Sequence, residues 1–148
     1  MAFMKKAKML ILFIVLTITF IAIIWGFTMR INTDFSTEAL LEFHYQAVSG
    51  GYNQDTSISV VITDEKDILV LQEMLRGFSV IDTFPCGFSA DISITMTNGR
   101  RGITFLPAND GCPILRVGDA NRYIRVADDA IKKLHEIFER YGGFFPCI

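Results

Sequence analysis

Residues 92–106 read ISITMTNGRRGITFL, and this stretch decides the fold of the chain. Apolar and polar residues alternate on both sides of Asn98 and Gly99, which is the pattern of two half-buried strands. Asn-Gly readily takes the two positive φ angles of a type I′ turn. We therefore expect a tight antiparallel hairpin in which Thr97 faces Arg100.

The segments on either side of this hairpin show two kinds of periodicity. Alternating residues predict further strands at 41–45, 58–62, 114–117 and 123–126. Apolar stripes with helical spacing predict one helix capped by Thr63 or Asp64, with Asp67 among the acids that the helix dipole favours in its first turn, and a last helix capped by Asp128. The order of strand, strand, helix, four strands and helix predicts an α+β domain. We expect an antiparallel sheet with two helices packed on one face.

An apolar run at residues 9–29 precedes this domain and contains no charged residue. Its length as a helix matches the hydrocarbon core of a bilayer, and a helix satisfies its own backbone groups in lipid. We therefore expect a transmembrane signal-anchor helix. Lys5, Lys6 and Lys8 precede the run and a lone Arg30 follows it, so the positive-inside rule predicts a cytoplasmic N-terminus.

These features divide the chain into a cytoplasmic tail (1–8), the anchor (9–29), a polar tether (30–38) and an extracytoplasmic domain (39–148). The expected protein is a single-pass protein of the cell membrane with its C-terminal domain outside. The alternative is a cleaved signal peptide, which would leave a secreted protein. Against it, the apolar run is longer than a usual signal core and no A-x-A-like site follows.

The charge of the chain is uneven once the anchor is set apart. Of fourteen basic residues, four flank the apolar run, and all sixteen acids lie beyond it. Ten basic residues against sixteen acids give the outer domain a formal charge near −6. An acidic domain of this kind is not expected to bind nucleic acid.

All three cysteines, Cys86, Cys112 and Cys147, lie beyond the anchor, where disulfides can form. Extending the hairpin register places Cys86 opposite Gly111, one residue from Cys112, although Pro107 interrupts ladder pairing on the way. An odd number of cysteines leaves one thiol over. We expect a bridge between Cys86 and Cys112, with Cys112–Cys147 as the alternative.

The same cysteines, together with His44 and His135, are the candidates for zinc or thiol chemistry. Structural zinc sites usually bring their ligands in close pairs such as C-x2-C, and no such pair occurs in the sequence. The sequence also lacks G-x-S-x-G, H-E-x-x-H and S-x-x-K motifs and a glycine-rich phosphate loop before a helix. We therefore expect no catalytic residue, no cofactor and no metal.

Arginines are concentrated between positions 100 and 125, where they outnumber acids by five to two. They are Arg100, Arg101, Arg116, Arg122 and Arg125. If the second hairpin pairs Val117 with Arg122, then Arg116 faces Tyr123 and Ile114 faces Arg125. Arginine binds carboxylate and phosphate well, so this region is the candidate site for an anionic surface, polymer or protein. An ordinary solvated sheet face with cation–π packing is the plainer interpretation.

Three classes of function remain from the sequence. The first is a membrane-anchored extracytoplasmic binding or interaction module without catalytic activity, because no catalytic motif is present. The second is a thiol- or zinc-dependent enzyme or sensor that uses Cys86, Cys112 and Cys147. The third is an accessory subunit of a membrane complex, docked through the anchor helix, in which Ala22 and Gly26 have small-xxx-small spacing.

Overall fold

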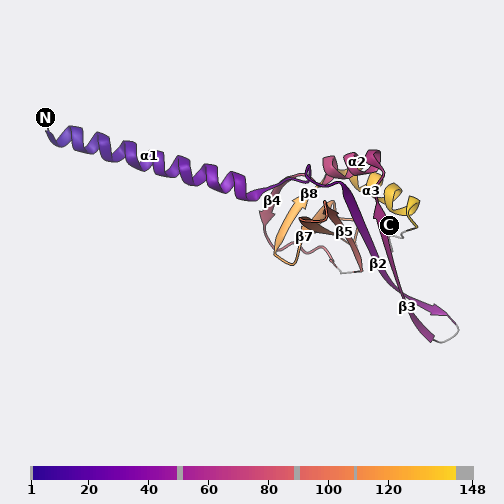
Figure 1. Cartoon of the computed structure of the whole chain (residues 1–148). Coiled ribbons are helices and arrows are strands. Elements are labelled where there is room, and N and C mark those ends of the chain that lie inside the picture. The colour runs from indigo at the N-terminus through magenta and orange to yellow at the C-terminus, as the bar shows by residue number, and fades with distance from the viewer. Residues whose placement is uncertain (1, 50–51, 89–90, 109, 143–148) are drawn as a thin grey trace. The chain divides into compact units, whose positions relative to one another are not determined.

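The computed structural model of this chain describes all residues except 1, 50–51, 89–90, 109 and 143–148 (Figure 1). It also leaves out the side chains of residues 2–8, 10, 27–28, 45–49, 52–56 and 128. The chain divides into two units, residues 1–30 and 31–148. The first unit is almost entirely one helix, and the second carries the sheet and two further helices.

Helix α1 runs over Ala2–Met29. Residues 11–26 are all exposed. The Thr17 hydroxyl donates a hydrogen bond to the carbonyl oxygen of Phe13, and Thr19 bonds one turn back in the same way, so these polar groups are satisfied inside the helix. Within the described residues, no helix is both long and apolar enough to cross a membrane.

Eight strands form one sheet in the order β1-β4-β8-β7-β6-β5-β2-β3. Their bounds are β1 Arg30–Ile31, β2 Glu38–Ser49, β3 Tyr52–Ile62, β4 Gly77–Ile81, β5 Ile92–Thr97, β6 Gly102–Pro107, β7 Ile114–Val117 and β8 Arg122–Arg125. The pairings from β4–β8 through β2–β3 are antiparallel. The predicted α+β domain with an antiparallel sheet is therefore confirmed. Strands β1 and β4 were not predicted from the sequence, because β1 has only two residues and the apolar residues of β4 end in the adjacent pair Val80 and Ile81, which breaks the alternation.

The β5–β6 hairpin has a longer turn than the Asn-Gly pattern predicts. Thr97 pairs with Gly102 instead of Arg100. Gly99 has a positive φ of 78°, but no described residue other than glycine has one, so Asn98 does not adopt the type I′ conformation. Its Oδ1 instead accepts hydrogen bonds of 3.1 and 3.0 Å from the backbone N–H groups of the two residues after Gly99. The hairpin is confirmed, whereas the two-residue turn is wrong.

The second unit contains helices α2, Glu65–Leu75, and α3, Asp128–Arg140. Helix α2 begins as predicted, because the Asp64 side chain accepts hydrogen bonds from two backbone N–H groups of the first turn. Helix α3 begins one residue earlier than predicted. Its N-cap is Ala127, without a side-chain hydrogen bond, and Asp128 is the first helical residue.

One hydrophobic core joins the sheet to α2 and α3, which lie side by side (Figure 1). Strands contribute Leu41, Phe43, Ile94, Met96, Phe105, Leu115 and Ile124, and the helices contribute Ile68, Leu71, Leu75, Leu134, Ile137 and Phe138. The rings of Phe43 and Phe138 meet edge to face with centroids 5.3 Å apart, a favoured aromatic geometry. Because side chains alternate across a strand, these strand residues define one face of the sheet, which we call the inner face.

The segment expected to be a tether packs onto the domain. Ile31 and Thr33 are buried. The Thr33 hydroxyl donates to the carbonyl oxygen of Gln72 in α2 at 2.9 Å, and Nε2 of Gln72 donates to the carbonyl oxygen of Ser36 at 2.8 Å. The compact second unit accordingly begins at Ile31 and not at residue 39.

Candidate functional site

The face of the sheet opposite the inner face, which we call the outer face, carries a smaller set of buried apolar residues. They are Leu106, Ala108, Ile114 and Tyr123, and none belongs to the main core. The loop that follows β4 covers Tyr123: the rings of Phe84 and Phe88 have centroids 5.1 and 5.3 Å from its ring. Phe88 also forms a β-bridge with Ala108. This loop therefore gives part of the outer face a fixed aromatic cover.

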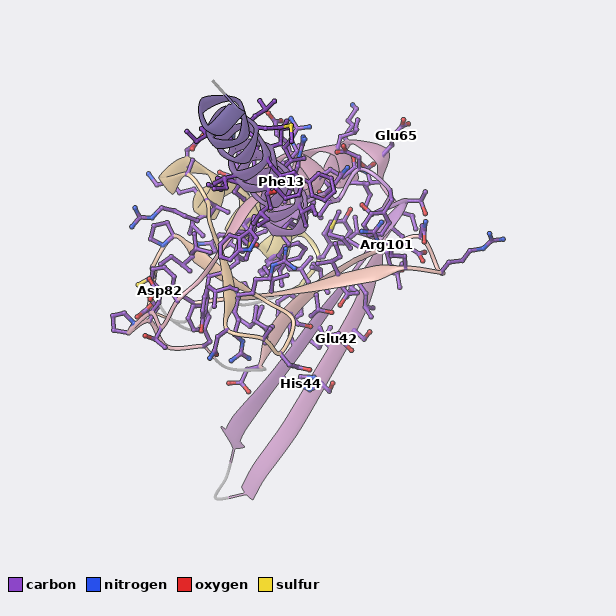
Figure 2. The ribbon with its side chains drawn as sticks, turned by 90° about the vertical axis from the view of Figure 1, so that its left-hand side faces the viewer. Phe13, Glu42, His44, Glu65, Asp82 and Arg101 are labelled. Carbon is purple, nitrogen blue, oxygen red and sulfur yellow. A yellow bond between two sulfur atoms is a disulfide. The ribbon has the colours of Figure 1, made fainter. Side chains whose placement is uncertain are left out.

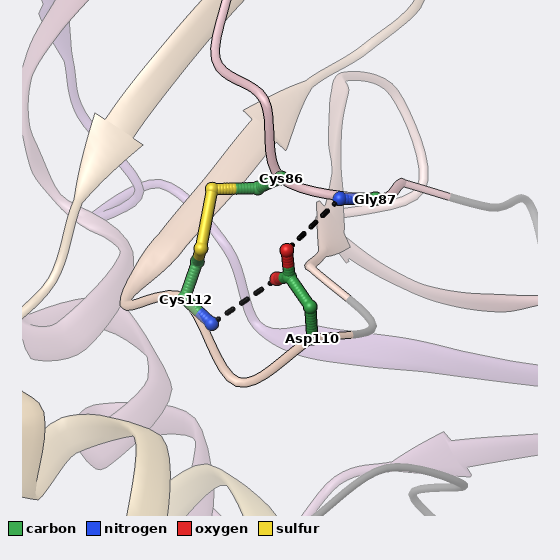
Figure 3. The surroundings of a disulfide bond; sticks show 4 residues. All are labelled: Cys86, Gly87, Asp110 and Cys112. Carbon is green, nitrogen blue, oxygen red and sulfur yellow. Dashed lines mark hydrogen bonds between the residues drawn. A yellow bond between two sulfur atoms is a disulfide. The ribbon is translucent and has the colours of Figure 1, made fainter.

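Cys86 and Cys112 join this loop to the segment before β7 (Figure 3). The two sulfur atoms lie at disulfide distance, and the Cα atoms are 6.3 Å apart, within the usual range for a bridge. The two carboxylate oxygens of Asp110 accept hydrogen bonds from the backbone N–H groups of Gly87 and Cys112, each 3.2 Å long. The alternative partner, Cys147, lies outside the described residues. Oxidation of the Cys86–Cys112 pair in the cell stays a prediction.

The same corner holds a possible set of metal ligands. The ligand atoms of Cys86, Asp110 and Cys112 lie within 4.8 Å of one another, and no other such group occurs among the described residues. Two thiolates and a carboxylate suit zinc, but the sulfurs can bind it only when they are reduced and deprotonated. A bridge and a metal therefore exclude each other at this corner.

The two histidines do not join this group. His44 is exposed on β2, on the same strand face as Glu42 (Figure 2). Its backbone N–H donates to the carbonyl oxygen of Asp91 at 2.7 Å. His135 is half-buried on α3. Burial lowers the pKa of His135, against the opposing effect of the nearby Glu139 carboxylate.

The five arginines are not gathered on one surface. The predicted β7–β8 register is confirmed, since Arg116 pairs with Tyr123 and Ile114 pairs with Arg125. Arg116 and Arg125 therefore lie diagonally on the outer face. Arg122 lies on the other face, where its Nε donates to the Ser79 hydroxyl at 2.7 Å.

The remaining two arginines, Arg100 and Arg101, lie in the turn between β5 and β6 and are exposed. The guanidinium carbon of Arg101 lies 4.5 Å from the centroid of the Phe35 ring, within cation–π range. This turn lies at the same end of the sheet as the β7–β8 turn but is distinct from both faces of the β7–β8 pair. The charge excess read from the sequence therefore divides over three places.

Arg116 and Arg125 also differ in their surroundings. The guanidinium carbon of Arg116 lies 5.9 Å from the centroid of the Phe88 ring, and its Nε is buried without a hydrogen-bond partner among the described residues. Arg116 therefore helps to hold the loop that covers the outer face. Arg125 is exposed and is the arginine of this face that a partner can reach directly.

A polar cluster between α2 and α3 was not predicted from the sequence. Nη1 of Arg140 contacts both carboxylate oxygens of Asp67, and the Tyr141 hydroxyl donates to one of them at 2.8 Å. The hydrogen bond to Asp67 raises the pKa of Arg140; burial, followed by the same carboxylate, raises the pKa of Tyr141. The signal was present in the sequence, because Asp67 lies one helical turn before Leu71 on the apolar stripe. The cluster ties the helices together and has no evident ligand role.

No protein-family model, curated protein or solved structure shows significant similarity to this chain. Among the described surfaces, the outer face combines a loop whose Cys86 lies at disulfide distance from Cys112, an aromatic cover and an exposed cation, Arg125. Loops held on a rigid sheet are where binding residues are commonly placed. The outer face is therefore the candidate binding site.

Proposed function

We propose that this protein is a membrane-anchored interaction module without catalytic activity, whose domain lies outside the cytoplasm. The observation that carries the anchor is the charge-free run at residues 9–29, preceded by Lys5, Lys6 and Lys8. Trp25 lies near the end of this run, where the aromatic belt of a membrane protein is expected. The positive flank keeps the N-terminus inside and leaves the domain outside.

The cysteines support the same compartment. Cys86 and Cys112 lie at disulfide distance, and such pairs persist in oxidising environments outside the cytoplasm. A bridge here would hold the aromatic loop on the outer face before any partner arrives. A surface that is already ordered loses less conformational entropy on binding, which suits a binding module.

The partner that the outer face suits best is anionic. Arg116 and Arg125 lie diagonally on this face within a domain whose formal charge is near −6. An anionic membrane surface, cell-wall polymer or acidic protein region would meet the exposed Arg125 guanidinium first, with the half-buried Arg116 adding positive charge behind it. No nucleic-acid role is proposed, because the domain as a whole is acidic.

Reporter fusions to the full chain test the topology. A C-terminal reporter that works only in the cytoplasm should be inactive, and one that works only outside should be active; the same reporters on the N-terminus should give the opposite pattern. Intact mass should show an uncleaved N-terminus. A mature chain that begins just after Thr28 would instead support a secreted protein, and cytoplasmic activity at the C-terminus would reject the topology.

A second candidate function is zinc- or thiol-dependent sensing at the corner of Cys86, Asp110 and Cys112, favoured by the closeness of their ligand atoms. Counting free thiols and assaying zinc in the purified full chain distinguish the sensor from the bridged interaction module. The bridged module should show one free thiol, from Cys147, and no bound zinc. Three reduced cysteines with one bound zinc, and loss of the zinc in Asp110→Asn, would support the sensor.

A further inference from the structure

Strand β4 exposes an unusual share of large apolar side chains. Phe78, Val80 and Ile81 are 68%, 49% and 68% exposed. The other exposed large apolar residues described in 31–148 are Val61 on β3 and Leu69 on α2, which stand singly. Single exposed apolar residues are ordinary, but three in one short strand mark an interaction surface.

The position of β4 in the sheet places it close to the end of the proposed membrane anchor, which favours lipid as its partner. Its neighbour is β1, which begins at Arg30, directly after the end of α1 at Met29. Only Arg30 separates Met29 from Ile31, and two residue steps of extended chain span at most about 7 Å. Neighbouring strands lie about 4.8 Å apart. If residues 9–29 span a bilayer, β4 cannot be far from the lipid surface where that segment ends.

Basic residues accompany the exposed apolar side chains. Ile81 pairs with Arg122 on β8, and the same register extended by one residue places Phe78 opposite Arg125. Arginine beside exposed apolar side chains suits the boundary of an anionic leaflet, where the apolar groups enter the acyl region and guanidinium groups stay with the phosphates. The exposed apolar side chains of β4 and the arginines that suit an anionic leaflet therefore lie side by side on β4 and β8.

We propose that β4 docks on the lipid surface, with Phe78, Val80 and Ile81 entering the leaflet in which the anchor ends. This proposal rests on the proposed membrane anchor. Phe78 and Val80 extend from the outer face and Ile81 from the inner face, so the contact is made by this margin of the sheet and not by one flat face. Docking fixes the orientation of the domain and leaves the far margin, β3, away from the membrane.

Tryptophan fluorescence tests the docking in the full chain, because Trp25 is its single tryptophan. The parent chain and three variants are reconstituted into phosphatidylcholine–phosphatidylglycerol vesicles with and without brominated acyl chains, which quench tryptophan on contact. Each variant combines Trp25→Phe with one further substitution: Phe78→Trp, Leu69→Trp or Val61→Trp. Val61 is also exposed, at 54% against 68% for Phe78, but it lies six strand positions from β4, about 30 Å across the sheet.

The expected result is strong quenching of Trp25 in the parent and of the Phe78→Trp variant, with little quenching of the other two. Circular dichroism of each variant should match the parent. If Trp25 is quenched but the Phe78→Trp variant is quenched no more than the Val61→Trp variant, the docking of β4 is wrong and the anchor stands. If Trp25 itself escapes quenching, the anchor and the docking are both rejected.

Discussion

Nη1 of Arg140 in α3 lies 2.6 and 2.8 Å from the two carboxylate oxygens of Asp67 in α2. The side chain of Asp67 is 9% exposed, whereas that of Arg140 is 57% exposed. We predict that Arg140→Gln lowers the free energy of unfolding, because it leaves a buried carboxylate without its charged partner. Denaturant unfolding of the variant and parent measures the loss.

The matched control for this variant is Lys133→Gln. Lys133 is equally exposed at 57%, and it pairs with the exposed Asp129 at 3.5 Å along the same helix. Exposed pairs of this kind contribute about 0.3–0.5 kcal/mol, so the control should change stability little. Equal losses in the two variants would show that the buried position of Asp67 is unimportant.

Reduction of the Cys86–Cys112 pair should destabilise the domain. The cysteines are 26 residues apart, and a bridge closing such a loop contributes about 3.5 kcal/mol in the chain-entropy model. Denaturant unfolding of the full chain with and without reductant measures the difference, and Cys147→Ser should leave it unchanged. Mass mapping of the non-reduced chain identifies the bridge directly. A bridge from Cys147 to either partner would contradict the assignment.

Gly99→Ala should destabilise the β5–β6 hairpin. Gly99 has φ at +78°, and a side chain in the left-handed region costs about 1–2 kcal/mol. Gly77→Ala is the control, because its added Cβ meets nothing within 4 Å and its φ is not in that region. Thermal unfolding compares the two variants. A Gly99→Ala variant as stable as the Gly77→Ala variant would mean that the turn takes another conformation in solution.

The sequence predicted the pairing of strands better than the turns between them. Side-chain alternation gave the β7–β8 register, in which Arg116 pairs with Tyr123. The Asn-Gly dipeptide misled at β5–β6, because Asn98 satisfies backbone N–H groups of a longer turn with its own side chain. A local dipeptide preference cannot decide between these turns when both preserve the antiparallel pairing.

The candidate site was less predictable, because it depends on contacts between distant segments. The approach of Cys86 to Cys112 was found from an approximate register. The predicted pairing, extended along the strands, places Cys86 opposite Gly111, and the observed Thr97–Gly102 pairing, extended in the same way, places it opposite Pro113. Both positions are next to Cys112. The packing of Phe84 and Phe88 on Tyr123 has no local signature in the sequence. The number of arginines likewise could not show that Arg122 lies on the opposite face from Arg116 and Arg125.

Acid should weaken the fold partly through His135. Burial lowers its pKa from the ordinary value of 6.5, so the unfolded chain binds a proton more readily than the folded one. The stabilising contribution of neutral His135 is therefore fully present above pH 6.5. It is lost as the pH falls from there through the lower pKa of the folded state. We predict that His135→Gln flattens this part of the stability profile. His44→Gln, at an exposed histidine, is the control, and an equal effect of both would reject the assignment.

The outer-face arginines should determine binding to anionic surfaces. With the full chain held in neutral lipid nanodiscs, Arg125→Gln should weaken co-sedimentation with phosphatidylglycerol vesicles, because each basic residue near a charged surface contributes about 1 kcal/mol. Adding Arg116→Gln should weaken binding further, and salt should act in the same direction through screening.

Arg100→Gln supplies the control for this experiment, since Arg100 is exposed but lies in the β5–β6 turn. It removes the same charge from the domain and should bind nearly as the parent does if the outer face is the contact. Because Arg116 supports the loop through Phe88, mass mapping should show that the Cys86–Cys112 pair persists in the double variant. If Arg100→Gln and Arg125→Gln weaken binding equally, net charge and not the outer face governs it. If the parent does not bind anionic vesicles, the anionic partner is rejected.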